Sequence, residues 1–151
     1  IDIPDQPDVA YFAVFDGHGG STISEYASQH LHQYIFNRPE YGNGDIESAL
    51  KGAFLALDED IIKNGELNSA QIGTTAITVL IKNNFLYCAN VGDSRAIASI
   101  SGQVKPLSFD HKPFNDQEEK RIVNAGGKVE GQRVNGVLAL SRAFGDGLFK
   151  G

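Results

Sequence analysis

Five consecutive residues, DGHGG at positions 16–20, place an acid, an imidazole and three glycines in one short segment. The segment follows an apolar run at residues 11–15, which has the length of a buried strand, and precedes a stretch typical of an amphipathic helix. Carboxylate oxygens such as those of Asp16 are ligands that Mg²⁺ or Mn²⁺ prefers. The imidazole of His18 can release a proton near neutral pH. A cation that activates water and an acid that protonates a leaving group are what phosphate-ester hydrolysis needs.

The same segment also has a purely structural interpretation. A strand that turns tightly into a helix favours glycine, with Asp16 as a capping residue and His18 exposed to solvent. Three glycines in five positions each cost conformational entropy on folding, which is more than a capped turn requires. The residues alone therefore indicate a metal-assisted hydrolase, with an ordinary turn as the alternative.

Length, composition and charge narrow the classes of protein. The 151 residues suffice for one hydrophobic core and are too few for two ordinary domains. A hydrophobic content of 41% and a charged content of 21% are typical of a globular protein. The net charge of −6 and the lack of a basic stripe argue against a nucleic-acid partner. No apolar run reaches the roughly 18 residues of a membrane-spanning helix, so no membrane association is expected.

The single cysteine indicates the cellular compartment of the protein, and the first residues indicate whether the chain is a piece of a longer one. Cys88 is the single cysteine, so an internal disulfide is excluded and a reducing compartment is expected, in the cytoplasm, the nucleus or both. Its apolar sequence neighbours predict a small core residue. Because the chain begins at Ile1 and shows no signal-like segment, we expect it to be a piece of a longer protein.

Two amphipathic helices are predicted in the first half of the chain. Residues 21–36 carry an apolar residue at every fourth position, and Thr22 with Glu25 has the capping-box pattern. Residues 46–61 carry a second apolar stripe, which Asp45 can cap and an Asn-Gly pair at residues 64–65 can end.

His30 and His32 fall on the polar side of the first helix. We expect them to be surface residues rather than ligands, because no other candidate ligand is near them in the helical pattern.

The second half of the chain changes to short strands with hairpin spacing. They are predicted over residues 74–81, 85–91, 95–100 and 103–107. The short gaps between them favour an antiparallel sheet built from hairpins. A short helix is expected from Asn115, with Glu118 as its capping-box partner and a Gly-Gly pair at residues 126–127 as its end, and an Asn-Gly hairpin turn follows at residues 135–136. Helices beside antiparallel hairpins indicate the α+β class.

Seven motifs occur along the chain in an order typical of one family. They are DGHGG at 16–20, GTTA at 73–76, ANVGDSR at 89–95, DHKP at 110–113, AGG at 125–127, RVNG at 133–136 and LALSRAFGD at 138–146. On these motifs the chain resembles the type 2C protein phosphatases, metal-dependent enzymes that act on phosphoserine and phosphothreonine. The resemblance implies a four-layer αββα sandwich, with two antiparallel sheets face to face and helices outside. Residues 1–151 would form the central part of that catalytic domain and an incomplete copy of the sandwich.

The resemblance also implies roles for single residues. Asp16 would bridge two Mg²⁺ or Mn²⁺ ions, Gly17 would offer its carbonyl oxygen to them, and a water between the ions would attack phosphorus. His18 would be the general acid that protonates the departing seryl or threonyl oxygen. Asp93 has two interpretations, either an ordinary turn residue that bonds its own backbone or a ligand of a third, weaker ion. Asp146 is a second-tier metal candidate.

The remaining polar motifs are expected to be structural. Arg95 should form an ion pair rather than contact phosphate, and the loops at residues 110–113 and 141–146 should satisfy buried backbone groups. The family's acidic pair and phosphate-binding arginine upstream of the first strand have no counterpart in residues 1–10, and Lys150 stands where a later carboxylate would be required. The ligand set is therefore incomplete, and these 151 residues alone should be weak or inactive as an enzyme.

Three hypotheses remain open. The first is an active phosphatase of phosphorylated proteins, whose missing metal ligands come from sequence outside this chain. The second is a catalytically inactive binding or scaffold domain that keeps the fold and recruits phosphoproteins or a kinase. The third is a partly built sandwich whose uncovered strands cause self-association. The sequence indicates neither the physiological substrate nor the oligomeric state.

Overall fold

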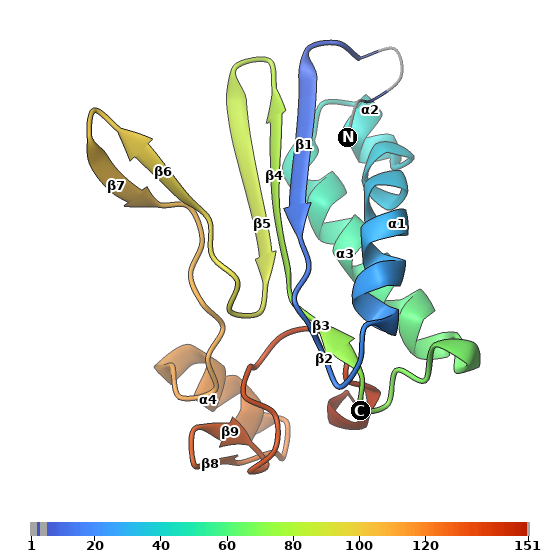
Figure 1. The fold of residues 1–151 in the computed structure, drawn as a ribbon, viewed down its shortest axis with the longest axis vertical. Helices are drawn as coiled ribbons and strands as arrows, with labels where there is room; N and C mark the ends of the chain where they lie inside the picture. Colours follow the sequence, from blue (N-terminus) through green and yellow to red (C-terminus); the bar gives the residue numbers. More distant parts are fainter. Residues whose placement is uncertain (1–2, 4–5, 151) are drawn as a thin grey trace.

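The computed structural model describes residues 3 and 6–150, and at its centre is a three-stranded antiparallel sheet with helices against one face (Figure 1). The strands are β1 (Val9–Val14), β4 (Ala76–Lys82) and β5 (Phe85–Val91), with β4 in the middle. The helices are α1 (Thr22–Phe36), the short α2 (Pro39–Gly42) and α3 (Ile46–Lys63). Two short 3-10 helices, η1 (Gly65–Leu67) and η2 (Gly147–Phe149), follow in the chain. No helix among the described residues is both long and apolar enough to cross a membrane.

The hydrophobic core lies between this sheet and α1 and α3. The predicted apolar stripe of α1 is fully buried, and the predicted stripe of α3 is buried with it. From β4, Ala76 and Leu80 face the helices, and Phe144 enters the same core from near the end of the chain. Both helix predictions are therefore confirmed, because a stripe that repeats every three to four residues must find an apolar surface to cover it.

The helix ends agree only in part with the predicted caps. Asp45 caps α3 as predicted, since its Oδ1 accepts a hydrogen bond of 3.1 Å from the backbone N–H of Ser48. The capping box predicted for α1 is wrong. The N-cap residue is Ser21 rather than Thr22, and it makes no side-chain capping bond.

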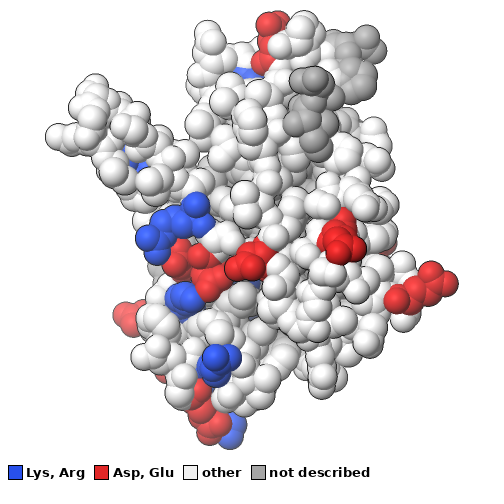
Figure 2. Space-filling view, in the orientation of Figure 1, with Lys and Arg blue, Asp and Glu red and all other residues white. Residues whose placement is uncertain are grey.

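The other face of the central sheet is uncovered by the described residues. Phe12 is 60% exposed there, and Val14 and Leu86 on the same face are also open to solvent. The strands β6 (Ile97–Ile100) and β7 (Gln103–Pro106) pair only with each other, so the predicted hairpin between β5 and β6 is wrong. Their ribbon stands apart from the body, and oppositely charged side chains gather below it (Figure 2). The α+β class is confirmed, and the described residues form one helix layer and one main sheet of the four layers that the resemblance implies.

Cys88 is not the small core residue that the sequence predicts. Its side chain is half-buried, whereas its β5 neighbours Tyr87 and Ala89 are the residues that pack against the core. Because side chains alternate along a strand, Cys88 lies on the open side of the sheet.

A second, very short sheet brings distant parts of the chain together below the first. In it β3 (Gly73–Thr74) lies between β2 (Gly17–His18) and β10 (Phe144–Gly145). Gly73 is opposite His18 on one side and opposite Gly145 on the other. The DGHGG segment and the final motif of the chain therefore meet across a single pair of residues.

The last part of the fold is α4 (Asp116–Asn124) with a small hairpin of β8 (Val129–Glu130) and β9 (Arg133–Val134). The helix occurs where it is predicted. The predicted Asn-Gly turn at residues 135–136 is also present, and it closes an antiparallel bridge between Val134 and Leu138. The turn between β8 and β9 is an additional one that the sequence does not indicate.

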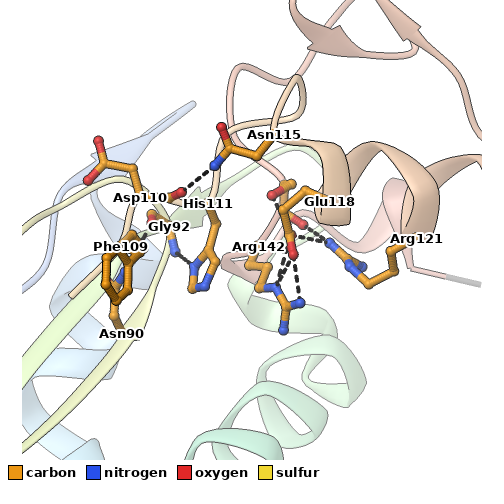
Figure 3. A network of polar contacts seen from close by, with 10 residues as sticks. Asn90, Gly92, Phe109, Asp110, His111, Asn115, Glu118, Arg121 and Arg142 are labelled. Atoms are coloured by element: carbon orange, nitrogen blue, oxygen red, sulfur yellow. Dashed lines mark hydrogen bonds and ion pairs between the residues drawn. The ribbon is translucent and has the colours of Figure 1, made fainter.

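A buried carboxylate connects α4 to the loop that leads into β10 (Figure 3). Glu118 is almost fully buried, and Arg142 reaches both of its oxygens at 2.7 to 3.2 Å. Ser141 and Arg121 donate to the same carboxylate at 2.6 and 3.0 Å. The capping box predicted between Asn115 and Glu118 is therefore wrong, because Glu118 is used by residues more than twenty positions away.

Two leucine substitutions in α3 test whether the core between the helices and the sheet is packed as described. Leu57→Ala removes a fully buried side chain from α3 and should lower the free energy of unfolding by about 3 kcal/mol. Leu55→Ala changes the same residue type in the same helix at a position that is 74% exposed, and it should cost less than about 0.5 kcal/mol. Urea unfolding of both variants measures the difference. Equal costs for the two would contradict the described packing.

The Glu118 network predicts a dependence of stability on pH. Burial opposes ionisation of Glu118, but hydrogen bonds from Arg142, Ser141 and Arg121 outweigh it and lower the pKa from 4.5 to about 2. A carboxylate whose folded-state pKa is lowered stabilises the fold above its unfolded pKa, and this contribution is lost as the pH falls from about 4.5 toward 2.

Glu118→Gln should therefore destabilise the protein at pH 7, by about 2 kcal/mol, because hydrogen bonds to a charged group are lost and the half-exposed arginines moderate the effect. The variant should also lose less stability than the wild type between pH 5 and pH 3. Glu119→Gln, at the exposed neighbouring position, is the control and should follow the wild type. Parallel pH profiles for wild type and Glu118→Gln would refute the role of the network.

Candidate active site

A cavity of about 620 Å³ lies where the central sheet, the short second sheet and the final loops meet. Asp16, Gly17, His18, Asp93 and Asp146 all line it. These are the residues that the sequence analysis singles out, and they come from three segments far apart in the chain. The structure therefore brings every predicted site residue to one place, together with an apolar wall from residues 137–140.

Asp16 is held at the cavity mouth through its backbone. Its N–H donates to Thr75 Oγ1 at 3.1 Å, and the N–H of Thr75 donates back to the Asp16 carbonyl oxygen at 3.0 Å. This exchange fixes the end of β1 against the start of β4 and leaves the Asp16 side chain exposed. Thr75 also bonds Ser94 at 2.7 Å between the two hydroxyl oxygens. Thr75 thereby ties the loop of Asp16 to the loop of Asp93, a role that sequence reasoning misses.

The glycines after Asp16 are required by close contacts. A Cβ atom on Gly17 would lie 2.7 Å from Ser24 Oγ, and one on Gly19 would lie 2.3 Å from the carbonyl oxygen of Gln71. Gly19 also has a φ of +73°, which side-chain-bearing residues adopt rarely. The glycine-rich segment therefore packs too closely on its neighbours to carry side chains at these positions, and Asp16 and His18, on either side of Gly17, both line the cavity.

Asp93 lies in the loop between β5 and β6 and lines the same cavity. In the described part of the chain its carboxylate forms an ion pair with Lys112, not a hydrogen bond to its own turn. The interpretation of Asp93 as an ordinary turn residue requires a hydrogen bond to its own backbone, and the described residues show none. The ammonium group of Lys112 contacts the Asp93 carboxylate instead.

The other polar motifs are structural, as expected. Arg95 forms a two-pronged ion pair with Asp110, at 2.9 and 2.8 Å. His111 and Gly92 exchange two bonds, because the backbone N–H of Gly92 donates to His111 Nδ1 at 3.1 Å and the N–H of His111 donates to the Gly92 carbonyl oxygen at 2.9 Å (Figure 3). Burial lowers the pKa of His111, which suits a neutral ring that accepts a backbone hydrogen bond.

His18 is bonded to Asp146 from the other end of the chain. Its Nε2 lies 2.7 Å from Oδ2 of Asp146, and the Asp146 side chain is only 3% exposed whereas that of His18 is 29% exposed. The hydrogen bond to Asp146 raises the pKa of His18, burial opposes this, and the nearby charges of Asp146, Asp16 and Asp93 add to the rise. Asp146, which the sequence analysis names as a second-tier metal candidate, is a buried carboxylate that is already bonded to the imidazole of His18.

His30 and His32 lie away from this site, but both are half-buried rather than the fully exposed surface residues that the sequence predicts. His30 stacks on Tyr26 at 4.1 Å between ring centroids, and its Nδ1 lies 2.7 Å from the Tyr26 carbonyl oxygen. Neither histidine lines the cavity.

The donors present fit a divalent cation in kind but not in number. The carboxylates of Asp16 and Asp93 and the carbonyl of Gly17 are oxygen ligands of the type that Mg²⁺ and Mn²⁺ take. Within residues 3 and 6–150, however, no three His, Cys, Asp or Glu side chains form a group that could hold an ion. The site is therefore part of a metal centre at most. Its own chemistry is that of a hydrogen-bonded imidazole beside two carboxylates in an open cavity.

Comparison with known proteins gives a consistent result. Residues 3–151 match the family model described as protein phosphatase 2C. A probable protein phosphatase 2C from Caenorhabditis elegans is 49% identical over 150 residues, which are 99% of this chain and 42% of that protein. Protein phosphatase 2C homolog 2 from Schizosaccharomyces pombe is 46% identical over 145 residues, covering 95% of this chain and 39% of the relative. The chain thus spans about two fifths of the length of these relatives.

Solved structures agree on the fold. The serine-threonine phosphatase 2C from Toxoplasma gondii superimposes with a TM-score of 0.85 at 22% identity, over 98% of this chain and 61% of the other, which bears on the fold alone. A sex-determining protein of C. elegans superimposes with a TM-score of 0.78 at 33% identity, over 91% of this chain and 36% of that one. The matched family model covers nearly all of the chain, so this chain belongs to the protein phosphatase 2C family.

Proposed function

We propose that this chain is part of the catalytic domain of a protein serine/threonine phosphatase that hydrolyses phosphoserine and phosphothreonine in protein substrates. The observation that carries the proposal is the convergence of Asp16, His18 and Asp93 on one cavity, each within a motif of the family. The chain spans only part of its relatives, so the activity is proposed for the complete protein.

Asp16, the Gly17 carbonyl and Asp93 would contribute ligands to Mg²⁺ or Mn²⁺, two or three ions in all. When bound, the ions supply a nucleophile from water at neutral pH and offset the charge of the phosphoryl oxygens. Asp16 suits this role because its backbone is fixed by Thr75 while its carboxylate is free to face the cavity. Lys112 is bonded to Oδ2 of Asp93, so cation binding and this ion pair compete for one carboxylate.

His18 would act as the general acid. A phosphate ester of serine or threonine has a poor leaving group, because an alkoxide is strongly basic and must be protonated as the bond to phosphorus breaks. The ring of His18 is partly exposed to the cavity, and the nearby carboxylates favour its protonated form. A proton can therefore pass from the ring to the departing oxygen.

The cavity wall suits a substrate that is a protein chain. The cavity measures about 620 Å³, and residues 137–140 with Leu148 and Phe149 add an apolar lining to that of the acids. Arg133 also lines it and provides a cation on an otherwise acidic protein. Apolar contacts can hold the residues around a phosphorylated side chain while its phosphate lies near Arg133 and His18. A cytoplasmic or nuclear location of this protein stays a prediction from cysteine usage.

A non-catalytic binding domain is the second candidate. Two observations favour it, namely the lack of a three-donor group among the described residues and the occupation of Asp93 by Lys112. Such a domain would bind phosphoproteins or a partner kinase in the same cavity without hydrolysis. Metal-dependent turnover by the complete protein separates the two candidates.

The metal proposal predicts that Asp16→Ala weakens Mn²⁺ binding and hydrolysis together. The test is calorimetric titration of Mn²⁺ into the complete protein, with p-nitrophenyl phosphate turnover measured in parallel. The wild type should bind Mn²⁺. Asp16→Ala should lose this binding, and its turnover should fall by more than about 100-fold. Glu66→Ala, an exposed acid outside the cavity, is the control and should keep both properties. A wild type that ignores Mn²⁺ and is inert would rule out the phosphatase.

The role of His18 predicts a loss of turnover without a loss of metal. His18→Gln should slow hydrolysis of a phosphothreonine peptide by about 100-fold or more, which is the usual contribution of a general acid, while Mn²⁺ binding remains. His30→Gln, on α1 and outside the cavity, provides the matched comparison and should behave as wild type. Unchanged peptide turnover in His18→Gln would show that another group protonates the leaving oxygen.

A further inference from the structure

We propose that Asp146 is the positioning residue of His18. By accepting a hydrogen bond from Nε2, it fixes the imidazole so that Nδ1 is the ring nitrogen that protonates the leaving oxygen. The inference rests on the proposed phosphatase function, because it assigns Asp146 a task within the step of His18. It also gives a role to an acid that the metal hypothesis does not use.

The first support is the contact itself. Nε2 of His18 and Oδ2 of Asp146 are 2.7 Å apart, which is a short charge-assisted hydrogen bond. The Asp146 side chain is 3% exposed, so its charge is removed from water and needs a partner within the protein. His18 is that partner, and its ring extends from the buried acid to the cavity.

The second support is the way in which the backbone makes room for this contact. Gly73 lies between His18 and Gly145 in the short sheet. A Cβ atom on Gly73 would lie 2.4 Å from Asp146 Oδ2 and 2.7 Å from His18 Nε2. Any side chain at position 73 would therefore occupy the space in which the two groups meet. The strand between them bears the one residue type that lets them bond.

The third support is the backbone of Asp146. Its φ of 52° and ψ of 44° are left-handed, a region that Asp enters more readily than most residues with a side chain. Its N–H donates to the Ile72 carbonyl oxygen at 3.0 Å, directly before Gly73. This bond fixes the residue that carries the carboxylate beside the strand residue that leaves room for the contact.

The chemical consequence follows from the two nitrogens of imidazole. A carboxylate accepts only, so the hydrogen-bonded Nε2 must carry a proton in every state of the ring. When His18 is protonated, the second proton is therefore on Nδ1. As the bond between phosphorus and the leaving oxygen breaks, that oxygen takes the proton from Nδ1, and a neutral ring with Nε2–H remains. Asp146 keeps its hydrogen bond to Nε2 throughout and holds the ring in place.

Kinetics with two leaving groups test this role. p-Nitrophenolate is a stable anion that leaves without a proton, whereas the more basic phenolate needs one. In the complete protein with Mn²⁺, Asp146→Asn should slow phenyl phosphate hydrolysis by about 10- to 100-fold and p-nitrophenyl phosphate hydrolysis by less than about threefold. In a His18→Gln background, Asp146→Asn should not change the ratio of the two rates further, because both variants remove the same proton transfer.

Asp58→Asn is the matched control. Asp58 holds the neighbouring Gly145 and Lys150 but does not bond His18, so its loss loosens the same strand without removing the ring's partner. This variant should leave the ratio of the two rates unchanged. A ratio that shifts in Asp58→Asn as it does in Asp146→Asn, or equal slowing of both substrates by Asp146→Asn, would overturn the positioning role and leave a structural one.

Proton NMR gives a readout that is independent of turnover. The wild type should show a far-downfield ring N–H resonance from Nε2 of His18, which should be lost in Asp146→Ala and in His18→Gln. Absence of this resonance, or a neutral His18 protonated at Nδ1, would overturn the inference. A wild type that hydrolyses neither aryl phosphate would instead overturn the phosphatase function, and the catalytic task of Asp146 with it.

Discussion

Thr75 is the residue on which the geometry of the site depends. It exchanges two hydrogen bonds with the backbone of Asp16 and shares a third with Ser94, so one threonine joins the end of β1, the start of β4 and the loop after β5. The central sheet delivers these three segments to the same edge, but without this junction their loops would be free to separate. Because Thr75 itself is buried, its hydroxyl must be bonded, and the bonds it makes define where the acids lie.

Charge is balanced locally around the site on a protein that is acidic overall. Lys112 pairs with Asp93, Arg95 pairs with Asp110, and Arg142 and Arg121 pair with Glu118. Asp16 stands apart from this pattern, as an exposed carboxylate at a cavity with no cationic side chain bonded to it among the described residues. An acid left open in a region where its neighbours are paired is the natural place for a cation from solution, and this contrast favours Asp16 as the central ligand of the proposed metal centre.

Local patterns of sequence predict the local elements well. The apolar stripe of α1 and α3, the Asp45 cap and the strands β4 to β7 depend on residues a few positions apart, and each is confirmed. Two of the errors occur where a distant partner competes. Glu118 leaves its predicted capping box for Arg142, 24 positions away. The short gap before β6 predicts a hairpin, yet that segment bonds Thr75 and Ser108 instead and leads the chain away from β5.

The candidate site is predicted in its parts but not in its connections. The residues Asp16, His18 and Asp93 can be found from motifs, since each motif is a short string. The bond between His18 and Asp146 spans 128 positions, and no periodicity or spacing in a sequence encodes it. It depends on three two-residue strands meeting in one register, which is decided by the packing of the whole fold.

Gly73 restricts the register in which β3 can pair with β2 and β10. A slide by one position would place Thr74 or Ile72 between His18 and the end of β10, and each of these has a side chain where no atom fits. Two-residue strands have too few hydrogen bonds to choose an alignment by themselves. The absence of a side chain at Gly73 therefore selects the strand register, because only one register leaves space where the imidazole and the carboxylate meet.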